Sequence, residues 1–393
     1  MKSLQITLNE ASLELDSSPA SAVAFTKARL HLRHTAFIEL NQKAIVDTCY
    51  GDGDFRRYKG LRLLAIDGSK ILLPDTTGVI EEFGEISYSN GKEAKVAGKH
   101  TYGLVSVLYD VLNKIAVDSN LGRGDAYEVE LAIGHLKQTE SGDLLVCDRN
   151  YPSYRFIAEL SILRRDFVIR CSAASFGTAR KMLRGEGEDS QTVKLHPPNG
   201  MLQEMRKRGL PEHLDKLDAP QITVRFVRVL LNTGEYEVLV TSLLDEATFP
   251  TAEFKELYHL RWQEEGFYGI LKTRLNLENF TGKSAESVYQ DFYATIYLSG
   301  LESLLTADSN EQFAQKQVAH PQQVNHAVSF NAIKNTVFDL LCSDSDVDRI
   351  IKRIQELFLK NPVCIRKNRN PPRKKKSSRH LLNYWQRIRK FCF

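Results

Sequence analysis

The sequence has no apolar run of about 18 residues, the usual minimum for a helix that crosses a membrane. Its first sixteen residues also lack the apolar region of a secretory signal peptide. The six cysteines are scattered and include no Cys-x2-Cys pair, which argues against a zinc site or a disulfide framework. We therefore expect a cytosolic protein with reduced thiols and no contact with a membrane.

Acidic residues are missing from residues 361–393, a stretch that contains eleven Lys or Arg. The net charge of the whole chain is +4, so residues 1–360 together carry −7. An acidic body with a basic tail predicts a polyanionic partner for the tail, although many basic tails are only solvated. The length of 393 residues is enough for two or three domains, and no internal repeat is visible.

The stretch 251–276 has the apolar pattern of a helix of about seven turns. With residues placed about 100° apart, its polar side chains Tyr258, Arg261, Glu265 and Lys272 fall within a stripe about 60° wide. The opposite side carries the apolar residues Leu260, Phe267, Ile270 and Leu271. An ordinary amphipathic helix with a salt-bridged surface gives the same pattern, so the stripe alone does not decide a function.

An alternation of strands and helices precedes that stretch. We predict strands at 61–67, 101–110, 114–120, 142–148 and 166–171, with helices at 125–136 and 151–165. Three strands, a helix, a strand, a helix and a strand are the order of a ribonuclease H-like α/β fold. In that fold the ends of the first and fourth strands lie side by side in a mixed sheet.

Two aspartates stand at the ends of these two strands. Asp67 closes the apolar run LRLLAID, and Asp148 closes GDLLVCD. Each aspartate alone is weak evidence, because Asp-Gly and strand-end aspartates are common in turns. Asp75 in LPDTT competes with Asp67 for the first position, and we prefer Asp67 because it follows the longer apolar strand.

The remaining chain completes the predicted organisation. Residues 221–231 and 236–244 alternate apolar and polar side chains around Asn232-Thr233-Gly234-Glu235, which predicts a long β-hairpin. Residues 284–305 predict a helix, and the polar stretch 306–323 predicts a linker or loop. The predicted segments are a helical N-terminal region at 1–58, the first half of the ribonuclease H-like core at 59–171, a β-rich insertion at 172–245, the second half of the core at 246–305, and a helical C-terminal region with a basic tail at 306–393.

Five cationic or titratable side chains lie close together in the N-terminal region, namely Lys27, Arg29, His31, Arg33 and His34. One interpretation is a small domain that contacts DNA through these side chains. The other is a helical cap on the catalytic core whose cations are only solvated. The sequence leaves the two interpretations open.

The spacing Tyr258-x2-Arg261-x3-Glu265-x6-Lys272 resembles the signature of bacterial DDE-type insertion-sequence transposases, in the large family named after insertion sequence four. The flanking words EYEVLVTSLLD and LENFTGKSAESVYQDFYA, together with IDGS and DRNYPSY upstream, are similar to that family too. The resemblance implies catalytic, metal-holding acids Asp67, Asp148 and Glu265 with two Mg²⁺ ions, for which Mn²⁺ substitutes. It also implies no organic cofactor, double-stranded DNA as transposon ends and target, a homodimer on paired ends, and a bacterial, nucleoid-associated protein.

Further roles follow from the same resemblance. Tyr258, Arg261 and Lys272 would grip the DNA backbone near the cut, and Arg149 is a fainter candidate beside Asp148. The alternative for Arg261 and Lys272 is a salt bridge with Glu265. Some relatives stack a flipped base on an aromatic residue of the inserted hairpin, where this chain has Glu237. Two rival functions remain, a metal-dependent DNA nuclease that does not transpose and a catalytically silent DNA-binding relative.

Overall fold

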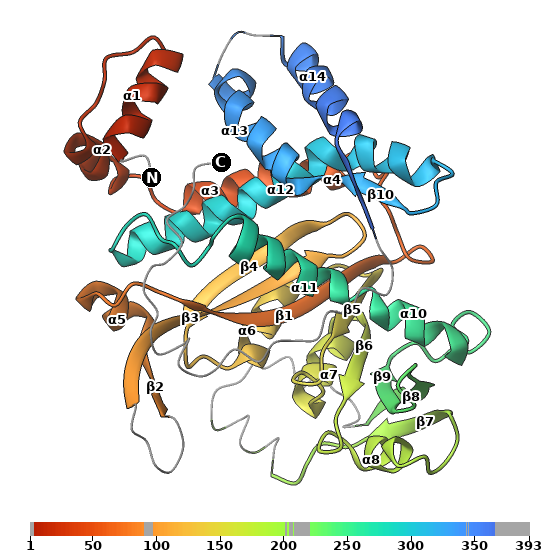
Figure 1. Cartoon of the computed structure of the whole chain (residues 1–393). Helices are drawn as coiled ribbons and strands as arrows, with labels where there is room; N and C mark the ends of the chain where they lie inside the picture. Colours follow the sequence, from red (N-terminus) through yellow and green to blue (C-terminus); the bar gives the residue numbers. More distant parts are fainter. Residues whose placement is uncertain are drawn as a thin grey trace. The chain divides into compact units, whose positions relative to one another are not determined.

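The structure, a computed structural model, describes residues 4–89, 97–200, 221–342 and 346–365, together with residues 203, 207 and 344. The chain forms two compact units (Figure 1). Unit 1 comprises Met1–Asp52, Leu72–Thr101 and Ile270–Phe393, and unit 2 comprises Gly53–Ile71 and Tyr102–Gly269. None of the helices in the described ranges is both long enough and apolar enough to span a bilayer.

Unit 2 is built on a mixed sheet with the strand order β4-β3-β1-β5-β6-β9-β8-β7. The strands are β1 (Arg62–Leu72), β3 (Ala97–Asp110), β4 (Ile115–Arg123), β5 (Asp143–Cys147), β6 (Asp166–Cys171), β7 (Ser190–Leu195), β8 (Ile222–Leu230) and β9 (Tyr236–Thr241). Strand β1 pairs in parallel with β5, and β5 pairs in parallel with β6, whereas β3 and β4 form an antiparallel pair.

This order confirms the predicted ribonuclease H-like arrangement. The strands of the core lie in the order third, second, first, fourth and fifth, and the first, fourth and fifth run parallel. The predicted strands 61–67, 101–110, 114–120, 142–148 and 166–171 are all present, with helix α6 (Glu128–His135) and helix α7 (Tyr154–Ile162) between them. Strand β1 is longer than predicted, because it continues past Asp67 to Leu72.

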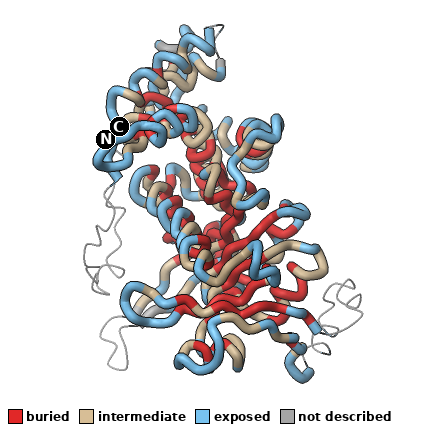
Figure 2. Tube along the Cα trace, turned by 90° about the vertical axis from the view of Figure 1, so that its right-hand side faces the viewer, coloured by how far each residue is buried: buried red, intermediate tan, exposed pale blue. Residues whose placement is uncertain are grey.

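The central strands are apolar because both of their faces are covered. Leu63 to Ile66 in β1 and Leu144 to Cys147 in β5 are fully buried, and buried positions are drawn red in Figure 2. A continuous apolar run is typical of parallel strands with helices on both faces. Each such side chain stabilises the fold by about 1.5–3 kcal/mol, so these strands form a rigid base for the residues at their ends.

The inserted segment extends the same sheet. Strands β8 and β9 form the predicted antiparallel hairpin, and β9 pairs with β6, so the hairpin continues the sheet beyond the core strands. Gly234 in its turn has a φ of +84°, a conformation that suits glycine. Helix α8 (Gly177–Leu183) precedes β7. The predicted division at 172–245 stays a prediction, since unit 2 contains the whole insertion.

Unit 1 is mainly helical. Its elements are α1 (Leu4–Glu14), α2 (Ala22–Arg29), α3 (Thr35–Leu40), the π-helix Asn41–Val46, α4 (Asp47–Tyr50), α5 (Thr77–Phe83), β2 (Glu85–Ser89), the π-helix Ile270–Arg274, α12 (Ala285–Gln315), β10 (Gln322–Val324), α13 (His326–Cys342), α14 (Val347–Lys360) and β11 (Pro362–Cys364). Strand β2 pairs with the first residues of β3. A methyl group added at Gly300 would lie 2.7 Å from Ile45 Cγ2, so glycine lets α12 approach the first π-helix closely.

The prediction of a linker or loop at 306–323 was partly wrong. Helix α12 continues through this stretch as far as Gln315. Thr306, Ser309 and Phe313 are buried on it, and Phe313 packs in a cluster with Ile354 and Phe358 of α14. Packing of one face therefore stabilises a helix whose polar composition resembles that of a loop.

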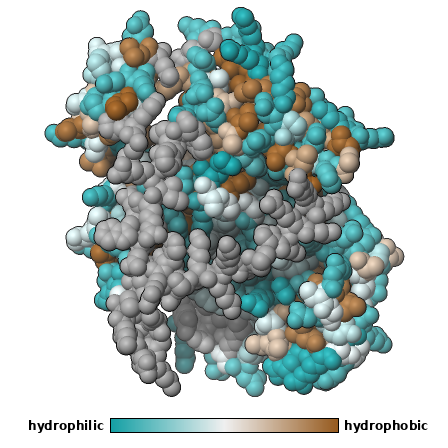
Figure 3. Space-filling model, in the orientation of Figure 1, coloured by the Kyte–Doolittle hydropathy of each residue, from teal (hydrophilic) through white to brown (hydrophobic). Residues whose placement is uncertain are grey.

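Helices α1 and α2 pack less well than the rest of unit 1. Several apolar side chains remain exposed on them, including Leu4, Ile6, Leu13, Val23 and Phe25. Brown, apolar atoms are visible at the upper left of Figure 3. Helix α2 has no buried residue. Polar contacts must therefore contribute much of what holds α2 in place.

Candidate active site

The two predicted aspartates meet at one edge of the sheet. The parallel pairing of β1 with β5 runs from Arg62 opposite Asp143 to Ile66 opposite Cys147, so Asp67 and Asp148 are the next residues of the two strands. Neighbouring strands lie about 4.8 Å apart, which makes these aspartates neighbours. The backbone N–H of Gly68 donates to Asp67 Oδ1 at 2.8 Å. The N–H of Asn150 donates to Asp148 Oδ1 at 2.7 Å.

Asp67 is the more perturbed of the two acids. Its side chain is only 18% exposed. Burial, and then the charge of Asp148, raise the pKa of Asp67 to about 6, although Arg261 opposes this shift. Buried carboxylates that repel each other hold protons more tightly, and a cation beside them relieves both costs. Asp67 therefore lies where a positive charge is most strongly favoured.

The stretch 251–276 is not the single helix that its pattern predicts. It consists of a 3₁₀ turn (Thr251–Glu253), α10 (Phe254–His259), a break at Leu260 and Arg261, α11 (Trp262–Gly269) and a π-helix. At the break, Arg261 N donates to Tyr258 O at 3.1 Å and Glu264 N donates to Arg261 O at 3.0 Å. Such bonds three residues apart tighten the turn and shift every later side chain around the axis. The prediction that these polar side chains form one continuous, solvent-facing stripe is therefore wrong.

Arg261 connects two of the predicted acids. Its side chain is only 6% exposed. Its Nη2 donates to Glu265 Oε1 at 2.8 Å, and its Nη1 lies 3.4 Å from Asp67 Oδ2. The salt bridge between Arg261 and Glu265 foreseen as the alternative is present. The guanidinium therefore brings Asp67 and Glu265 to a single positive group, in the structure described here.

Tyr258 lies inward rather than on the surface. It is 2% exposed, and its hydroxyl has no hydrogen-bond partner among the described residues. Glu237 of β9 is 7% exposed, and Arg170 Nε lies 3.0 Å from its Oε1. Burial raises the pKa of Glu237, whereas Arg170 and Arg261 lower it. Glu237 is thus held in an ion pair beside the site, an arrangement unlike that of an aromatic base platform.

A buried arginine fixes the start of the catalytic stretch. Arg225 of β8 is fully buried, and its Nη2 donates to Thr251 Oγ1 at 2.9 Å. Its Nη1 donates to Phe249 O at 2.7 Å. The hydroxyl of Thr251, the first residue of the stretch 251–276, accepts this bond. The inserted hairpin therefore anchors the segment that carries Arg261 and Glu265.

Two further carboxylates near Asp67 were missed. Glu264 is completely buried, and the charges of Asp67 and Asp148 act on it. Glu128 of α6 accepts from Asn150 Nδ2 at 3.3 Å, and a methyl group at Gly68 would lie 3.0 Å from its Oε1. The doublet of adjacent glutamates was the signal for Glu264. Glu128 carried no local signal.

The other candidate residues are placed less centrally. Arg149 is exposed beside Asp148. Lys272 lies in unit 1, where burial lowers its pKa and Glu278 opposes this shift. Asp75 also lies in unit 1, where its Oδ1 accepts from Thr101 N at 2.9 Å. Asp75 is therefore hydrogen-bonded to β3, and the preference for Asp67 stays a prediction.

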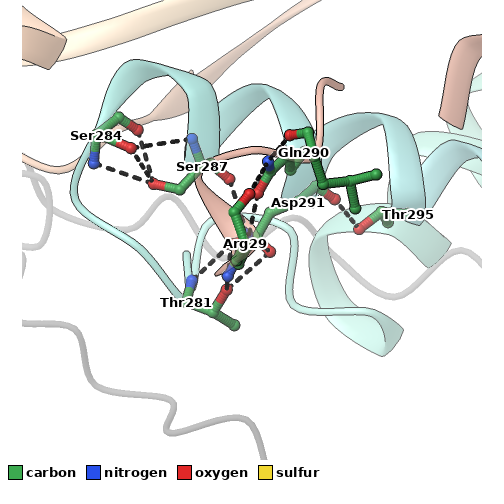
Figure 4. Close-up of polar contacts among 8 residues, drawn as sticks. Arg29, Thr281, Ser284, Ser287, Gln290, Asp291 and Thr295 are labelled. Atoms are coloured by element: carbon green, nitrogen blue, oxygen red, sulfur yellow. Dashed lines mark hydrogen bonds and ion pairs between the residues drawn. The ribbon is translucent and has the colours of Figure 1, made fainter. Parts of the chain in front are cut away.

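The N-terminal cations divide into two groups. Arg29 is bound within a polar network on α12 (Figure 4), where its Nε donates to Gln290 Oε1 at 2.6 Å and its Nη2 donates to Asp291 Oδ1 at 3.0 Å. His34 lies 2.9 Å from Glu286 through its Nδ1 and stacks on Tyr289. The exposed side chains are Lys27, His31 and Arg33. Arg29 and His34 therefore attach the N-terminal helices to α12.

The acids of the site fit a hard divalent cation in their chemistry. Carboxylate oxygens are the ligands that Mg²⁺ prefers in proteins. Asp67 and Asp148 repel each other, and Asp67 and Glu265 already share the positive charge of Arg261. Within the part of the chain that the structure describes, no three His, Cys, Asp or Glu side chains lie closely enough together to hold one metal ion.

Comparison with known families agrees with this geometry. Residues 58–299 match the family model described as the transposase DDE domain, which spans more than half of the chain. The chain belongs to this transposase family. The match confirms the family resemblance predicted from the spacing of Tyr258, Arg261, Glu265 and Lys272. The predicted acids Asp67, Asp148 and Glu265 lie within the matched range, and their roles stay a prediction.

Individual relatives are more distant. The chain is 25% identical over 246 residues to transposase InsG for insertion sequence element IS4 of Escherichia coli (strain K12). The alignment covers 60% of this chain and 50% of InsG, so the chain spans about half the length of that relative. A solved structure of piggyBac transposase in a synaptic complex with hairpin DNA has a TM-score of 0.40 and 8% identity, covering 81% of this chain and 60% of that chain.

Proposed function

We propose that this protein is a transposase of a bacterial insertion sequence, which cuts DNA at the terminal inverted repeats and joins the 3′-OH ends to target DNA. The observation that carries the proposal is that Asp67 and Asp148 directly follow the last paired residues of the neighbouring strands β1 and β5, with Arg261 linking Asp67 to Glu265. Membership of the DDE transposase family supports it.

Asp67, Asp148 and Glu265 are the acids that would hold two divalent cations, Mg²⁺ or Mn²⁺. When bound, such cations activate water and stabilise charge on the attacking and leaving oxygens of a phosphodiester. Asp67 lies beside Asp148 and shares Arg261 with Glu265, so it would act together with both of these acids in holding the cations. No side-chain nucleophile is required, since water makes the first cut and the freed 3′-OH makes the second attack.

Cationic side chains near the acids would hold the DNA backbone. Arg149 is exposed beside Asp148 and is free to approach a phosphate from solvent. Arg261 offers the planar fork that suits phosphate oxygens, whereas Lys272 offers a point charge. Tyr258 would contribute through its hydroxyl, which is buried here and must become accessible to touch DNA.

The partners follow from this activity. Double-stranded DNA would serve both as transposon end and as target, and a homodimer would hold two ends together. The eleven Lys or Arg of residues 361–393 lie outside the described residues, and they would provide sequence-independent affinity for the DNA backbone. The protein would act at the bacterial nucleoid.

Cleavage of a plasmid that carries the DNA flanking the gene tests the proposal. Purified wild type with Mg²⁺ should cut at the repeat ends, and Glu265→Gln should bind the same ends without cutting. Glu256→Gln is the matched control, because Glu256 is an exposed glutamate of α10 in the same stretch and should not affect cutting.

Each of the other outcomes would favour a different function or a different catalytic residue. Equal cutting by wild type and Glu265→Gln would show that another glutamate supplies the third acid. Cutting without joining to a target plasmid would favour a metal-dependent nuclease that does not transpose. Binding of the ends without cutting in Mg²⁺ or Mn²⁺ would indicate a catalytically silent DNA-binding relative.

A further inference from the structure

Two arginines of strand β8 are similarly buried and similarly bonded, but they face opposite ways. Arg225 and Arg228 lie three positions apart on β8, so their side chains leave the strand on opposite faces. The side chain of Arg225 is 0% exposed, and that of Arg228 is 10% exposed. Each guanidinium donates several hydrogen bonds and also lies over an aromatic ring. The two residues therefore differ mainly in the part of the protein that each one holds.

The hydrogen bonds of Arg228 stay within the inserted segment. Its Nε donates to Asp189 Oδ1 at 2.6 Å, and its Nη2 donates to Gly187 O at 3.0 Å. Its Nη1 donates to the backbone oxygens of Met182 and Glu186. All four acceptors belong to α8 or to the loop between α8 and β7. Arg228 therefore connects one part of the insertion to another.

Arg225 instead holds the segment that leads out of the insertion into the catalytic stretch. Its Nη1 donates to Phe249 O at 2.7 Å, and its Nη2 donates to Thr251 Oγ1 at 2.9 Å. Its guanidinium carbon lies 5.2 Å from the ring centroid of Phe254, the first residue of α10. Its Nε donates to Ser190 Oγ of β7 at 2.9 Å. Arg225 thus fixes the start of α10 to the sheet.

Two further contacts hold the same segment. Lys255 of α10 donates to Asn232 Oδ1, in the turn of the inserted hairpin, at 2.7 Å. Lys59 Nζ donates to Thr248 O at 2.7 Å, and Lys59 lies three residues before β1, the strand that carries Asp67. Strand β8 packs against the 3₁₀ turn and against α10, which lies beside the hairpin in Figure 1. The start of α10 is therefore fixed both to the hairpin and to the chain that enters β1.

The bonds of Arg225 add a direction that apolar packing does not supply. One face of α10 is buried through Phe254, Leu257 and Tyr258, but apolar contacts are non-directional. A guanidinium presents its N–H donors in a fixed planar fork. Burial of a charged group is costly, and apolar replacements of buried ion pairs often keep or raise stability. The directed bonds therefore explain the buried arginine better than a contribution to stability does.

We propose that Arg225 is a positioning residue for DNA cleavage, through which the inserted hairpin sets the place of Glu265 relative to Asp67. This inference rests on the proposed function, in which Glu265 is the third acid. Arg261 and Glu265 follow α10 across the break, and Arg261 contacts both acids. A shift of α10 would therefore move Glu265 and Arg261 away from Asp67 together. A misplacement of about 1 Å, caused far from the chemistry, can cost about 100-fold in rate.

Turnover on DNA that carries the repeat ends compares Arg225→Met with Arg228→Met. We expect Arg225→Met to lower the rate of cutting by about 100-fold while its affinity for the ends stays that of wild type. Arg228→Met loses a similar set of hydrogen bonds and should be destabilised similarly, yet it should cut at nearly the wild-type rate. Both variants are measured well below their unfolding temperatures. Arg225→Lys keeps the charge but not the planar fork, so its rate should lie between those of wild type and Arg225→Met.

A milder variant covers the case in which Arg225→Met does not fold. Thr251→Val removes one acceptor of Arg225 and keeps the branched shape of the side chain. This variant should fold and should lower the rate of cutting less than Arg225→Met does, again with unchanged affinity for the ends. Wild-type turnover by Thr251→Val and Arg225→Lys together would argue that the direction of these bonds does not matter.

Hydrogen exchange of the DNA-free protein tests the same contact without any cutting. Amide exchange reports local opening of individual segments. Arg225→Met should speed exchange within residues 254–269, which include α10 and α11. Arg228→Met should speed exchange within residues 177–190 and leave residues 254–269 as in wild type.

Three results would overturn the proposal. They are equal turnover of Arg225→Met and Arg228→Met, unchanged exchange of residues 254–269 in Arg225→Met, and a loss of cutting that is explained by weaker binding of the ends. The proposed function fails on a different result, the absence of cutting by wild type. Cutting by wild type together with equal turnover of the two arginine variants would therefore remove the role of Arg225 and leave the transposase assignment intact.

Discussion

Arg261 Nη1 lies 3.4 Å from Asp67 Oδ2, although the two residues are 194 positions apart in the sequence. This contact joins the break between α10 and α11 to the residue of β1 that follows its pairing with β5. A guanidinium here neutralises acids that would otherwise repel each other. Arg261 therefore serves the metal-free protein as an internal counter-ion, as well as being a candidate for phosphate contact.

Removal of that counter-ion should destabilise the protein when metal is absent. We expect Arg261→Met to lower the free energy of unfolding in EDTA by about 2–4 kcal/mol, because Asp67 and Glu265 lose their shared partner in a partly buried site. Chemical denaturation measures this effect. Arg149→Met is the control and should change stability little, since Arg149 is exposed. Equal effects of the two substitutions would argue against the counter-ion role.

The raised pKa of Asp67 predicts a pH-dependent stability. The folded protein holds this proton up to about pH 6, whereas an unfolded aspartate loses it near its ordinary pKa of 3.8. Ionisation of Asp67 therefore costs stability as pH rises from about 4 to 6. Relative to wild type, Asp67→Asn should gain roughly 2–3 kcal/mol across that window in EDTA, from 1.36 kcal/mol per pKa unit. Denaturation at several pH values measures the difference.

Asp75→Asn is a control with the opposite sign. Although burial opposes it, hydrogen bonds from Thr101 and His100 lower the pKa of Asp75. Because the pKa of Asp75 is lower in the folded than in the unfolded protein, its ionisation stabilises the fold at pH values above the unfolded pKa. That stabilisation is lost as the pH falls through the folded pKa. The difference between Asp75→Asn and wild type should thus become less favourable as pH rises. A rising difference for both variants would contradict the assignment to Asp67.

Several features of the site followed from local sequence. The apolar runs of β1 and β5 predicted buried strands, and the strand order predicted that Asp67 and Asp148 would be neighbours. The break at Leu260 and Arg261 was not predictable in this way, because the stretch 251–276 contains no proline and the contacts of Arg261 are long-range. The inward position of Glu264 follows from that break. Burial of α12 beyond residue 305 likewise depends on packing against α14.

The network of Arg29 predicts a structural rather than a DNA-binding phenotype. Arg29→Ala should lower stability by about 2 kcal/mol and expose α2 to proteolysis, because it removes charge-assisted hydrogen bonds to α12. Lys27→Ala changes an exposed cation two residues away and should leave stability unchanged. If Lys27 contacts a phosphate, its loss should reduce the slope of log affinity against log salt by about 0.9. A reduced slope for Arg29→Ala with intact stability would reverse the two roles.

The close approach of Gly300 to Ile45 predicts strong sensitivity to one methyl group. Gly300→Ala places Cβ 2.7 Å from Ile45 Cγ2 and should destabilise unit 1 by about 1–3 kcal/mol through overpacking. Gly134→Ala in α6 meets no atom within 4 Å and should be neutral or stabilising by up to about 1 kcal/mol. Thermal unfolding of both variants measures the contrast. Tolerance of alanine at Gly300 would mean that α12 can move away from the first π-helix.

The pairing of β9 with β6 has a consequence for attempts to shorten the protein. Val168 and Ile169 of β6 are fully buried, and β9 bonds to the side of β6 that β5 leaves open. Without residues 172–245, this apolar strand would offer unpaired amide and carbonyl groups to any other chain. Exposed strands of this kind recruit further copies into aggregates. The hairpin thus protects the edge of β6 from pairing with other molecules. A protein shortened by removal of residues 172–245 should therefore aggregate.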